Sequence, residues 1–130
     1  MNTIAQLDPQ IVWKNFYSLT QIPRPSKFEN EAAQFICDFG KNLGLESFRD
    51  EIGNVIIRKP ATPGMEDRMG IILQAHVDMV PQKNNDVEHD FKKDPIKPRI
   101  VDNMVYATGT TLGADNGLGC AVAMAVLESN

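Results

Sequence analysis

The sequence predicts an α/β fold arranged as a three-layer α/β/α sandwich, in which helices cover both faces of a sheet. Helical and strand-like patterns alternate along the 130 residues, and a chain of this length can bury a core of its own. The short apolar run at residues 71–73 also lacks the polar and apolar alternation that marks a half-exposed strand. A strand without this alternation is typical of a sheet that is covered on both faces.

The first helix is predicted over residues 9–20. Asp8 is a favourable N-cap, and Pro9 is tolerated at the first helical position. Apolar side chains then recur at helical spacing, namely Val12, Phe16 and Leu19. Pro23 and Pro25 prevent the helix from continuing, because a proline lacks an amide donor and restricts the residue before it.

A second helix is predicted to begin after a capping box that Ser26 and Glu29 form. Its apolar face consists of Phe28, Ala32, Phe35, Ile36, Phe39 and Leu43. Gly44 fits the position just after the helix, where a left-handed backbone conformation is common. The helix is therefore expected to end near residue 43.

Two pairs of short strands are predicted further along the chain. The first pair covers residues 46–49 and 54–58, with a turn between them. The second pair covers residues 99–101 and 104–106, and the Asp-Asn pair between them is typical of a two-residue hairpin turn.

The remaining segments are predicted as loops and one further helix. Residues 59–70 and 81–98 are rich in proline, glycine and polar residues, which is typical of surface loops. A glycine-rich turn at residues 108–119 leads into a final helix over residues 118–128. The apolar face of this helix carries Leu118, Ala121, Val122, Ala125 and Val126.

Composition excludes several classes of function. The chain has 13 Lys and Arg against 17 Asp and Glu, and it has no basic run of the kind that nucleic-acid-binding proteins use. No stretch of about 18 apolar residues could cross a membrane, and residues 1–8 lack the features of a signal peptide. Cys37 and Cys120 lie in apolar contexts and are expected to be buried free thiols. These features predict a cytoplasmic protein with no nucleic-acid or membrane partner.

The first candidate site residues are His76 and Asp78. In open α/β sheets, functional residues follow the carboxyl ends of strands, and these two follow the predicted strand at residues 71–73. Residues two apart on a strand share one face. The carboxylate could orient a metal-binding imidazole, the pair could perform acid–base chemistry, or the two could form a structural hydrogen bond. The pair alone leaves these three readings open.

Asp115 is the third candidate, and it lies in the glycine-rich turn before the last helix. Its two carboxylate oxygens could bridge two metal ions, or the residue could be an N-cap of the helix. Asn116 could also provide the cap while Asp115 points outward. A phosphate-binding loop is not indicated, because no Lys-Ser or Lys-Thr follows and an acidic residue would repel phosphate.

A second His-carboxylate pair, His89 and Asp90, lies in the polar loop at residues 81–98. This context favours a solvated or substrate-adjacent loop over a metal ligand. The sequence contains no Gly-X-Ser-X-Gly motif, and Cys120 has no His nearby in sequence. Nucleophilic catalysis by serine or cysteine therefore has no support.

Three stretches resemble the aminoacyl-histidine dipeptidases, also called Xaa-His or carnosinase-like dipeptidases. They read LQAHVDMVP at residues 73–81, HDF and DPI within residues 89–96, and GTTLGADNG at residues 109–117. These enzymes belong to a larger clan of co-catalytic zinc peptidases and deacylases. The resemblance extends from residue 10 to residue 128, and the order and 39-residue separation of His76 and Asp115 match the clan.

The resemblance implies a zinc-exopeptidase-like catalytic domain that hydrolyses small peptides. In it, His76 would bind one zinc ion, Asp115 would bridge two, and Asp78 would be the catalytic carboxylate that orients His76. The peptide bond between Asp115 and Asn116 is expected to be cis. Two zinc ions, with Mn or Co as possible replacements, would polarise the scissile carbonyl and activate a water, and a glutamate would accept the proton of that water.

The chain departs from the clan's pattern at its end. The clan's Glu-Glu pair, a further acidic ligand, a late His and a lid domain that carries dimerisation would all follow residue 128, and the sequence ends at Asn130. Residues 1–130 are therefore expected to be the N-terminal part of a catalytic domain, inactive alone and homodimeric when complete. The alternatives are a deacylase or tripeptidase of the same clan, and a non-catalytic α/β binding or regulatory domain.

Overall fold

The computed structural model describes residues 3–130, and it confirms the predicted alternation of helices and strands. The elements in order are the 3-10 helix η1 (Ile4–Gln6), α1 (Gln10–Thr20), α2 (Asn30–Asn42), β1 (Glu46–Arg49), β2 (Val55–Arg58), β3 (Pro98–Val101), β4 (Met104–Ala107) and α3 (Ala114–Glu128). Residues 1–2, part of the stretch searched for a signal peptide, lie outside the described residues.

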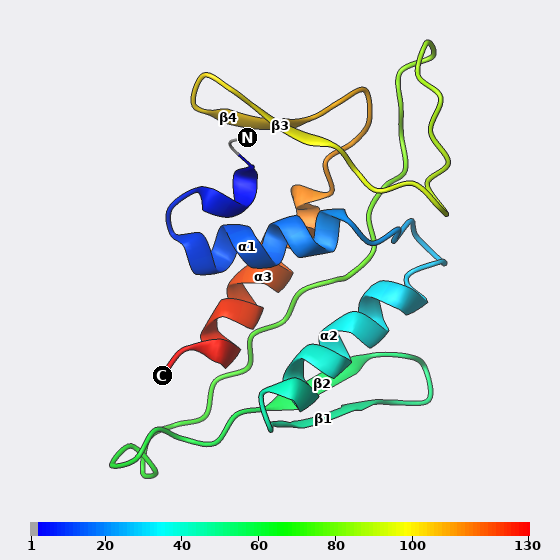
Figure 1. Ribbon diagram of the computed structural model, residues 1–130. Coiled ribbons are helices and arrows are strands. Elements are labelled where there is room, and N and C mark those ends of the chain that lie inside the picture. The colour runs from blue at the N-terminus through cyan, green and yellow to red at the C-terminus, as the bar shows by residue number, and fades with distance from the viewer. Residues whose placement is uncertain (1–2) are drawn as a thin grey trace.

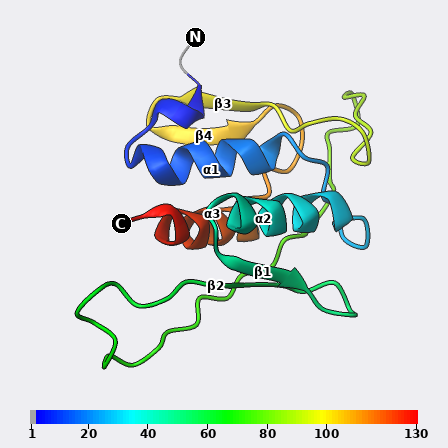
Figure 2. The same ribbon diagram turned by 60° about the horizontal axis from the view of Figure 1, so that its bottom comes forward.

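The helices lie between two antiparallel hairpins (Figure 2). One hairpin pairs β1 with β2 and packs against α2, and the other pairs β3 with β4 beside η1. Helix α1 packs against α3 (Figure 1), and Asn15 at the middle of α1 donates a 2.7 Å hydrogen bond to Glu128 at the end of α3. Asp102 occupies the β3–β4 turn with a φ of 52°, which an aspartate tolerates better than most residues.

Helix α3 contributes to both apolar clusters of the core. Cys120 and Met124 belong to a first cluster with Leu19 and Ile36, and Ala75 and Val77 pack against it. Ala121, the residue after Cys120, belongs to a second cluster with Ile4 and Phe16. Both cysteines are buried and free, as predicted. Because Ala75 and Val77 are held in the first cluster, the segment that carries His76 and Asp78 is fixed against α3.

The structure corrects both predicted N-caps. Pro9, not Asp8, takes the N-cap position of α1, and no side-chain cap hydrogen bond is made there. The N-cap of α2 is Glu29, again without a side-chain cap, so the capping box with Ser26 is wrong. The Ser26 hydroxyl instead donates to the carboxylate of Asp78, since a bond to a charged acceptor is stronger than one to a backbone amide.

The end of α2 agrees with the sequence prediction. Gly44 has a φ of 74°, and its amide donates to the carbonyl of Lys41. The amide of Leu45 donates to the carbonyl of Gly40, which completes a pattern typical of a glycine-terminated helix.

The predicted strand at residues 71–73 is wrong for the described chain. Ile71 and Ile72 are 84% and 92% exposed, and residues 70–75 make no backbone–backbone hydrogen bond to another described residue. The physical reason is the absence of a partner: each strand that is present pairs only with its hairpin neighbour. An extended apolar segment without a neighbouring strand forms neither a ladder nor a covered face.

Candidate functional site

The imidazole of His76 lies between two carboxylates. Its Nδ1 is 3.0 Å from Oδ1 of Asp78, and its Nε2 is 2.9 Å from Oδ1 of Asp115. The structure thus brings together the three candidate residues, although 39 positions separate His76 from Asp115 in sequence. Hydrogen bonds accepted by Asp115 and Asp78 raise the pKa of His76 above its ordinary value.

Asp78 is held from its other side by a serine. Its Oδ2 accepts a 2.5 Å hydrogen bond from the Ser26 hydroxyl, and this bond, followed by the one from His76, lowers the pKa of the carboxyl group. The carboxylate therefore remains charged and fixes the Nδ1 side of the imidazole. A carboxylate in this position orients a metal-binding histidine and sets which nitrogen faces the metal.

Asp115 projects from the start of α3 into solvent. Its side chain is 95% exposed, and the cap position of α3 belongs to Gly113, with no side-chain cap. The peptide bond between Asp115 and Asn116 is cis, as expected from the family resemblance. Asn116 accepts a 3.1 Å hydrogen bond from the amide of Gly119, so Asn116 caps the regular part of the helix. The alternative of Asp115 as the N-cap is wrong.

The donor atoms of His76 and Asp115 fit a zinc ion in kind and nearly in spacing. Two ligand atoms of a tetrahedral zinc lie roughly 3.4 Å apart, since each is about 2.0–2.1 Å from the metal. The observed 2.9 Å would need to open by a few tenths of an ångström. Within residues 3–130, no group of three or more His, Cys, Asp or Glu side chains is arranged to hold a metal ion. The chain therefore offers two first ligands of a site that needs at least three.

The second pair lies apart from these residues. The ring of His89 packs edge-to-face on Phe91, with 4.5 Å between centroids, and Asp90 accepts hydrogen bonds within its own turn. Neither side chain is hydrogen-bonded to His76, Asp78 or Asp115 in the part of the chain that the structure describes. Both residues lie in the long segment between β2 and β3, within the stretch that the sequence predicts as a loop.

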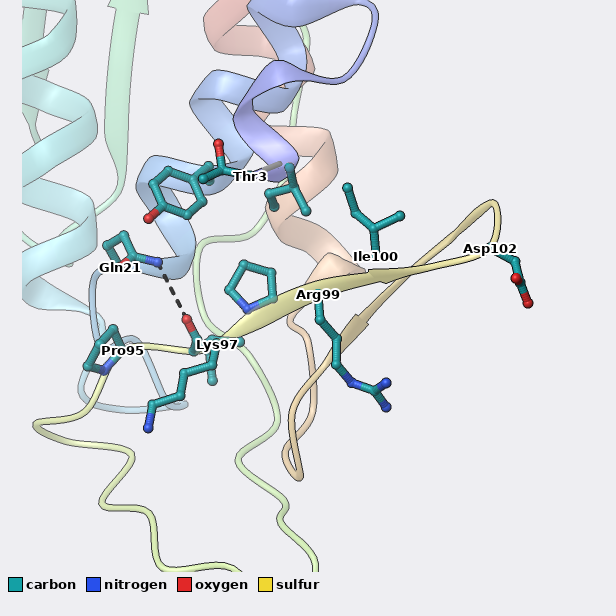
Figure 3. Close-up of a pocket in the computed structure, with 11 residues that line it drawn as sticks. Thr3, Gln21, Pro95, Lys97, Arg99, Ile100 and Asp102 are labelled. Carbon is teal, nitrogen blue, oxygen red and sulfur yellow. Dashed lines mark hydrogen bonds between the residues drawn. The ribbon is translucent and has the colours of Figure 1, made fainter. Parts of the chain in front are cut away.

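A hollow of about 660 Å³ lies elsewhere, between η1, α1 and β3. Figure 3 shows Gln21 on one wall, donating a 3.4 Å hydrogen bond to the Ile96 carbonyl, with Lys97 and Arg99 on the strand side. None of the three candidate residues lines this hollow. The candidate site is instead an open surface at the junction of residues 76–78 and α3.

Two residues of the site were missed in the sequence. Ser26 holds Asp78, but the Ser-X-X-Glu pattern directed attention to helix capping. Arg24 is 1% exposed and donates to the carbonyls of Val77 and Gly113, each at 2.9 Å. A charged residue between two prolines carries no burial signal in the sequence, so only the structure places it.

Comparison with known proteins gives two strong matches and no family profile. No protein-family model matches the chain. The chain is 54% identical over 127 residues to the cytosol non-specific dipeptidase of Escherichia coli. It also superposes on the aminoacylhistidine dipeptidase of Vibrio alginolyticus with a TM-score of 0.96 and 52% identity. The resemblance to aminoacyl-histidine dipeptidases is confirmed. Both matches cover 98% of this chain, which spans 26% of each relative's length.

More distant solved structures share the fold. An aminopeptidase of Bacillus cereus and a tripeptidase of Staphylococcus aureus both superpose with a TM-score of 0.68, at 25% and 22% identity. They cover 93% and 94% of this chain, which spans 32% of each. The predicted α/β class is confirmed by these matches. Among the described residues, no helix is long and apolar enough to span a membrane.

Proposed function

We propose that this chain is the N-terminal part of the catalytic domain of a metal-dependent dipeptidase. The observation that carries the proposal is the imidazole of His76 hydrogen-bonded between Asp78 and Asp115. The similarity to two dipeptidases over 98% of the chain supports the same reaction class. The name of the E. coli relative, a cytosol dipeptidase, supports a cytoplasmic enzyme.

In the proposed enzyme, His76 and Asp115 hold metal and Asp78 positions His76. Two bound zinc ions, or Mn or Co, would supply the Lewis acidity that polarises a peptide carbonyl and eases deprotonation of water. The hydrogen bond from Ser26 keeps Asp78 anionic, so that its carboxylate accepts a hydrogen bond from Nδ1–H of His76 and leaves Nε2 free for a metal. Metal binding would replace the present His76–Asp115 hydrogen bond, because both use the same two atoms.

The proposed substrates are dipeptides, with Xaa-His dipeptides the first to test. The two relatives are named for different breadth: one is called non-specific and the other aminoacylhistidine-directed. A series that varies the second residue of the dipeptide separates these two specificities. A homodimer is proposed for the complete enzyme, and analytical ultracentrifugation measures it directly.

The 130 residues alone are expected to be inactive. They bring two ligand side chains together, and a catalytic zinc needs at least three protein donors. Zinc-dependent release of histidine from β-Ala-His by the 130-residue chain would contradict this expectation. Reading the coding sequence past codon 130 tests whether the remaining metal ligands follow. An acidic pair and a distant His there would complete a two-metal site, and a stop codon would favour the non-catalytic binding or regulatory domain.

The decisive experiment replaces one histidine at a time in the complete protein. His76→Ala should remove dipeptidase activity and at least one bound zinc while the fold is retained. His89→Ala is the matched control, because His89 makes no hydrogen bond to the site; it should keep the full zinc content. Global unfolding of the His76 variant would instead assign His76 a structural role. Activity on acylated amino acids or tripeptides, without dipeptide activity, would assign the deacylase or tripeptidase branch.

A further inference from the structure

Arg24 is a buried cation that has no ion-pair partner among the described residues. Its side chain is 1% exposed, and no carboxylate oxygen of residues 3–130 lies within salt-bridge distance. Burial lowers the pKa of Arg24 from its ordinary value, because the charged form loses its hydration. A buried charge is costly, so its hydrogen bonds must serve a purpose that an apolar side chain could not fill.

The guanidinium donates to three carbonyls from three separate segments. Nε donates to Leu19 at the end of α1 at 3.4 Å, Nη1 to Val77 at 2.9 Å, and Nη2 to Gly113 at 2.9 Å. Val77 is the residue between His76 and Asp78, and Gly113 lies two residues before Asp115. One rigid, planar fork thus joins the two segments that carry the candidate ligands.

This guanidinium explains why glycine stands at positions 113 and 117, at the start of α3. A Cβ built on Gly113 or on Gly117 would lie 2.6 Å from Nη2 of Arg24. Gly113 also has a φ of 74°, which favours glycine. The glycine-rich turn, which carries no phosphate-loop pattern, therefore packs closely against the guanidinium of Arg24.

The backbone around Arg24 holds the same segment a second time. The amide of Met79 donates to the Arg24 carbonyl at 3.0 Å, and the amide of Ser26 donates to the Met79 carbonyl at 3.2 Å. The Ser26 hydroxyl then reaches Asp78. Because residues 70–75 have no strand partner in the described chain, these contacts replace the support that a sheet ladder usually gives.

We propose that Arg24 is a positioning residue that sets the separation of His76 and Asp115 by joining the carbonyls of Val77 and Gly113. The proposal rests on the proposed function, because the separation matters only if both side chains bind metal. Arg24 touches neither metal nor substrate and acts through the two backbone segments. A lysine at this position has donors on a single nitrogen at the end of a flexible stem, so it lacks the rigid planar fork that fixes both carbonyls at once.

The test compares Arg24→Lys with Arg58→Lys in the complete polypeptide that the gene encodes. Arg58 is the matched control because it lies at the surface, bonded to Glu46 at 2.8 Å. Zinc affinity is measured by competition with a chromogenic chelator, and the site's geometry by the visible absorption of the Co²⁺-loaded protein. Arg24→Lys should bind zinc about 10–100-fold more weakly and change the Co²⁺ spectrum, and Arg58→Lys should change neither.

A folded Arg24→Lys variant with unchanged zinc affinity and Co²⁺ spectrum would overturn the proposal. Arg24→Gln is the second variant, since its shorter, neutral side chain also lacks the guanidinium fork. Loss of the folded state in both variants would overturn it too, in favour of a purely structural role. If the wild-type protein binds neither metal, the proposed function fails. Crystal structures of the metal-free proteins then still test Arg24, because the variant should move His76 Nε2 out of hydrogen-bond distance of Asp115.

Discussion

Two segments of this chain outside the helices and strands, residues 24–26 and residues 70–75, differ in whether their backbone amides and carbonyls find hydrogen-bond partners. The first is held through the Met79 pairing and the fork of Arg24, and it fixes the candidate site. The second has strongly exposed apolar side chains and no backbone partner among the described residues. The difference shows that long-range backbone and side-chain hydrogen bonds hold part of the candidate site in place without a larger sheet.

The largest effect is expected from removing a buried aromatic side chain of α1 that lies near the Arg24 guanidinium, beside Gly117. Phe16 is fully buried, and it lies against Gly117 of the α3 turn. Phe16→Ala should cost about 3–5 kcal/mol, a large part of the roughly 5–15 kcal/mol that stabilises a typical domain, so the urea midpoint of the 130-residue chain should fall steeply. Phe28→Ala is the control: Phe28 is 52% exposed beside Lys92, and its loss should cost less than about 1 kcal/mol. Equal costs would show that the described core is not formed in solution.

A second test adds one methyl group at a glycine that contacts Arg24 and one at a glycine that does not. Gly113 and Gly44 share a φ of 74°, but only Gly113 has Arg24 against its Cβ position; nothing lies within 4 Å of the Cβ position of Gly44. Gly44→Ala should therefore cost only backbone strain, about 1–2 kcal/mol. Gly113→Ala should cost about 1–3 kcal/mol more, because the added carbon displaces the guanidinium. Urea unfolding of both variants measures the difference, and identical costs would contradict the packing of Arg24 under the turn.

For residues 70–75, the cost in stability of removing an apolar side chain is expected to depend on how much polypeptide is present. Ile72 is 92% exposed, so Ile72→Ala should change the stability of the 130-residue chain by no more than about 0.5 kcal/mol. If further polypeptide covers residues 70–75 in a complete enzyme, the same substitution should cost at least about 2 kcal/mol there. Denaturant unfolding of both proteins gives the two values. A small effect in both would mean that the apolar run stays exposed.

The parts of the fold that could be predicted from the sequence are those determined by neighbouring residues. The hairpin turn at Asp102, the glycine end of α2 at Gly44 and the helical periodicities all follow from short-range rules. Ser26 shows where such rules fail: the Ser-X-X-Glu pattern predicts a cap, but the hydroxyl finds the Asp78 carboxylate 52 residues away. Local patterns carry no information about which distant acceptor competes for a donor.

The candidate site was predictable in its residues but not in its support. His76, Asp78 and Asp115 were selected by their place in the fold and by the family resemblance, and the structure brings them within hydrogen-bond distance. The buried Arg24 could not be found, because charge normally indicates exposure in a sequence. The prediction of a strand at residues 71–73 is wrong for a related reason. Apolar side chains predict burial, but they do not identify the segment that would pack over them.

The smallest expected effect concerns the locally satisfied turn between β1 and β2. Asp50 accepts hydrogen bonds from the Asn54 side chain and from the amides of Ile52, Gly53 and Asn54. These bonds, the Asn54 side chain first, lower the pKa of Asp50 below its ordinary value of roughly 4. A lowered folded-state pKa means that the carboxylate stabilises the fold above the unfolded-state pKa, and this contribution is lost as pH falls through the lowered value.

Asp50→Asn isolates this contribution, because the amide oxygen still accepts from the backbone but cannot titrate. The wild-type chain should have the higher melting temperature at pH 6, and the difference should shrink as pH is lowered below roughly 4. The effect is expected to be small, since Asp50 is exposed and water competes for its hydrogen bonds. Scanning calorimetry at a series of pH values measures it. A difference that persists unchanged into acid would mean that the charge of Asp50 is not what stabilises this turn, and that the hairpin is held by its ladder alone.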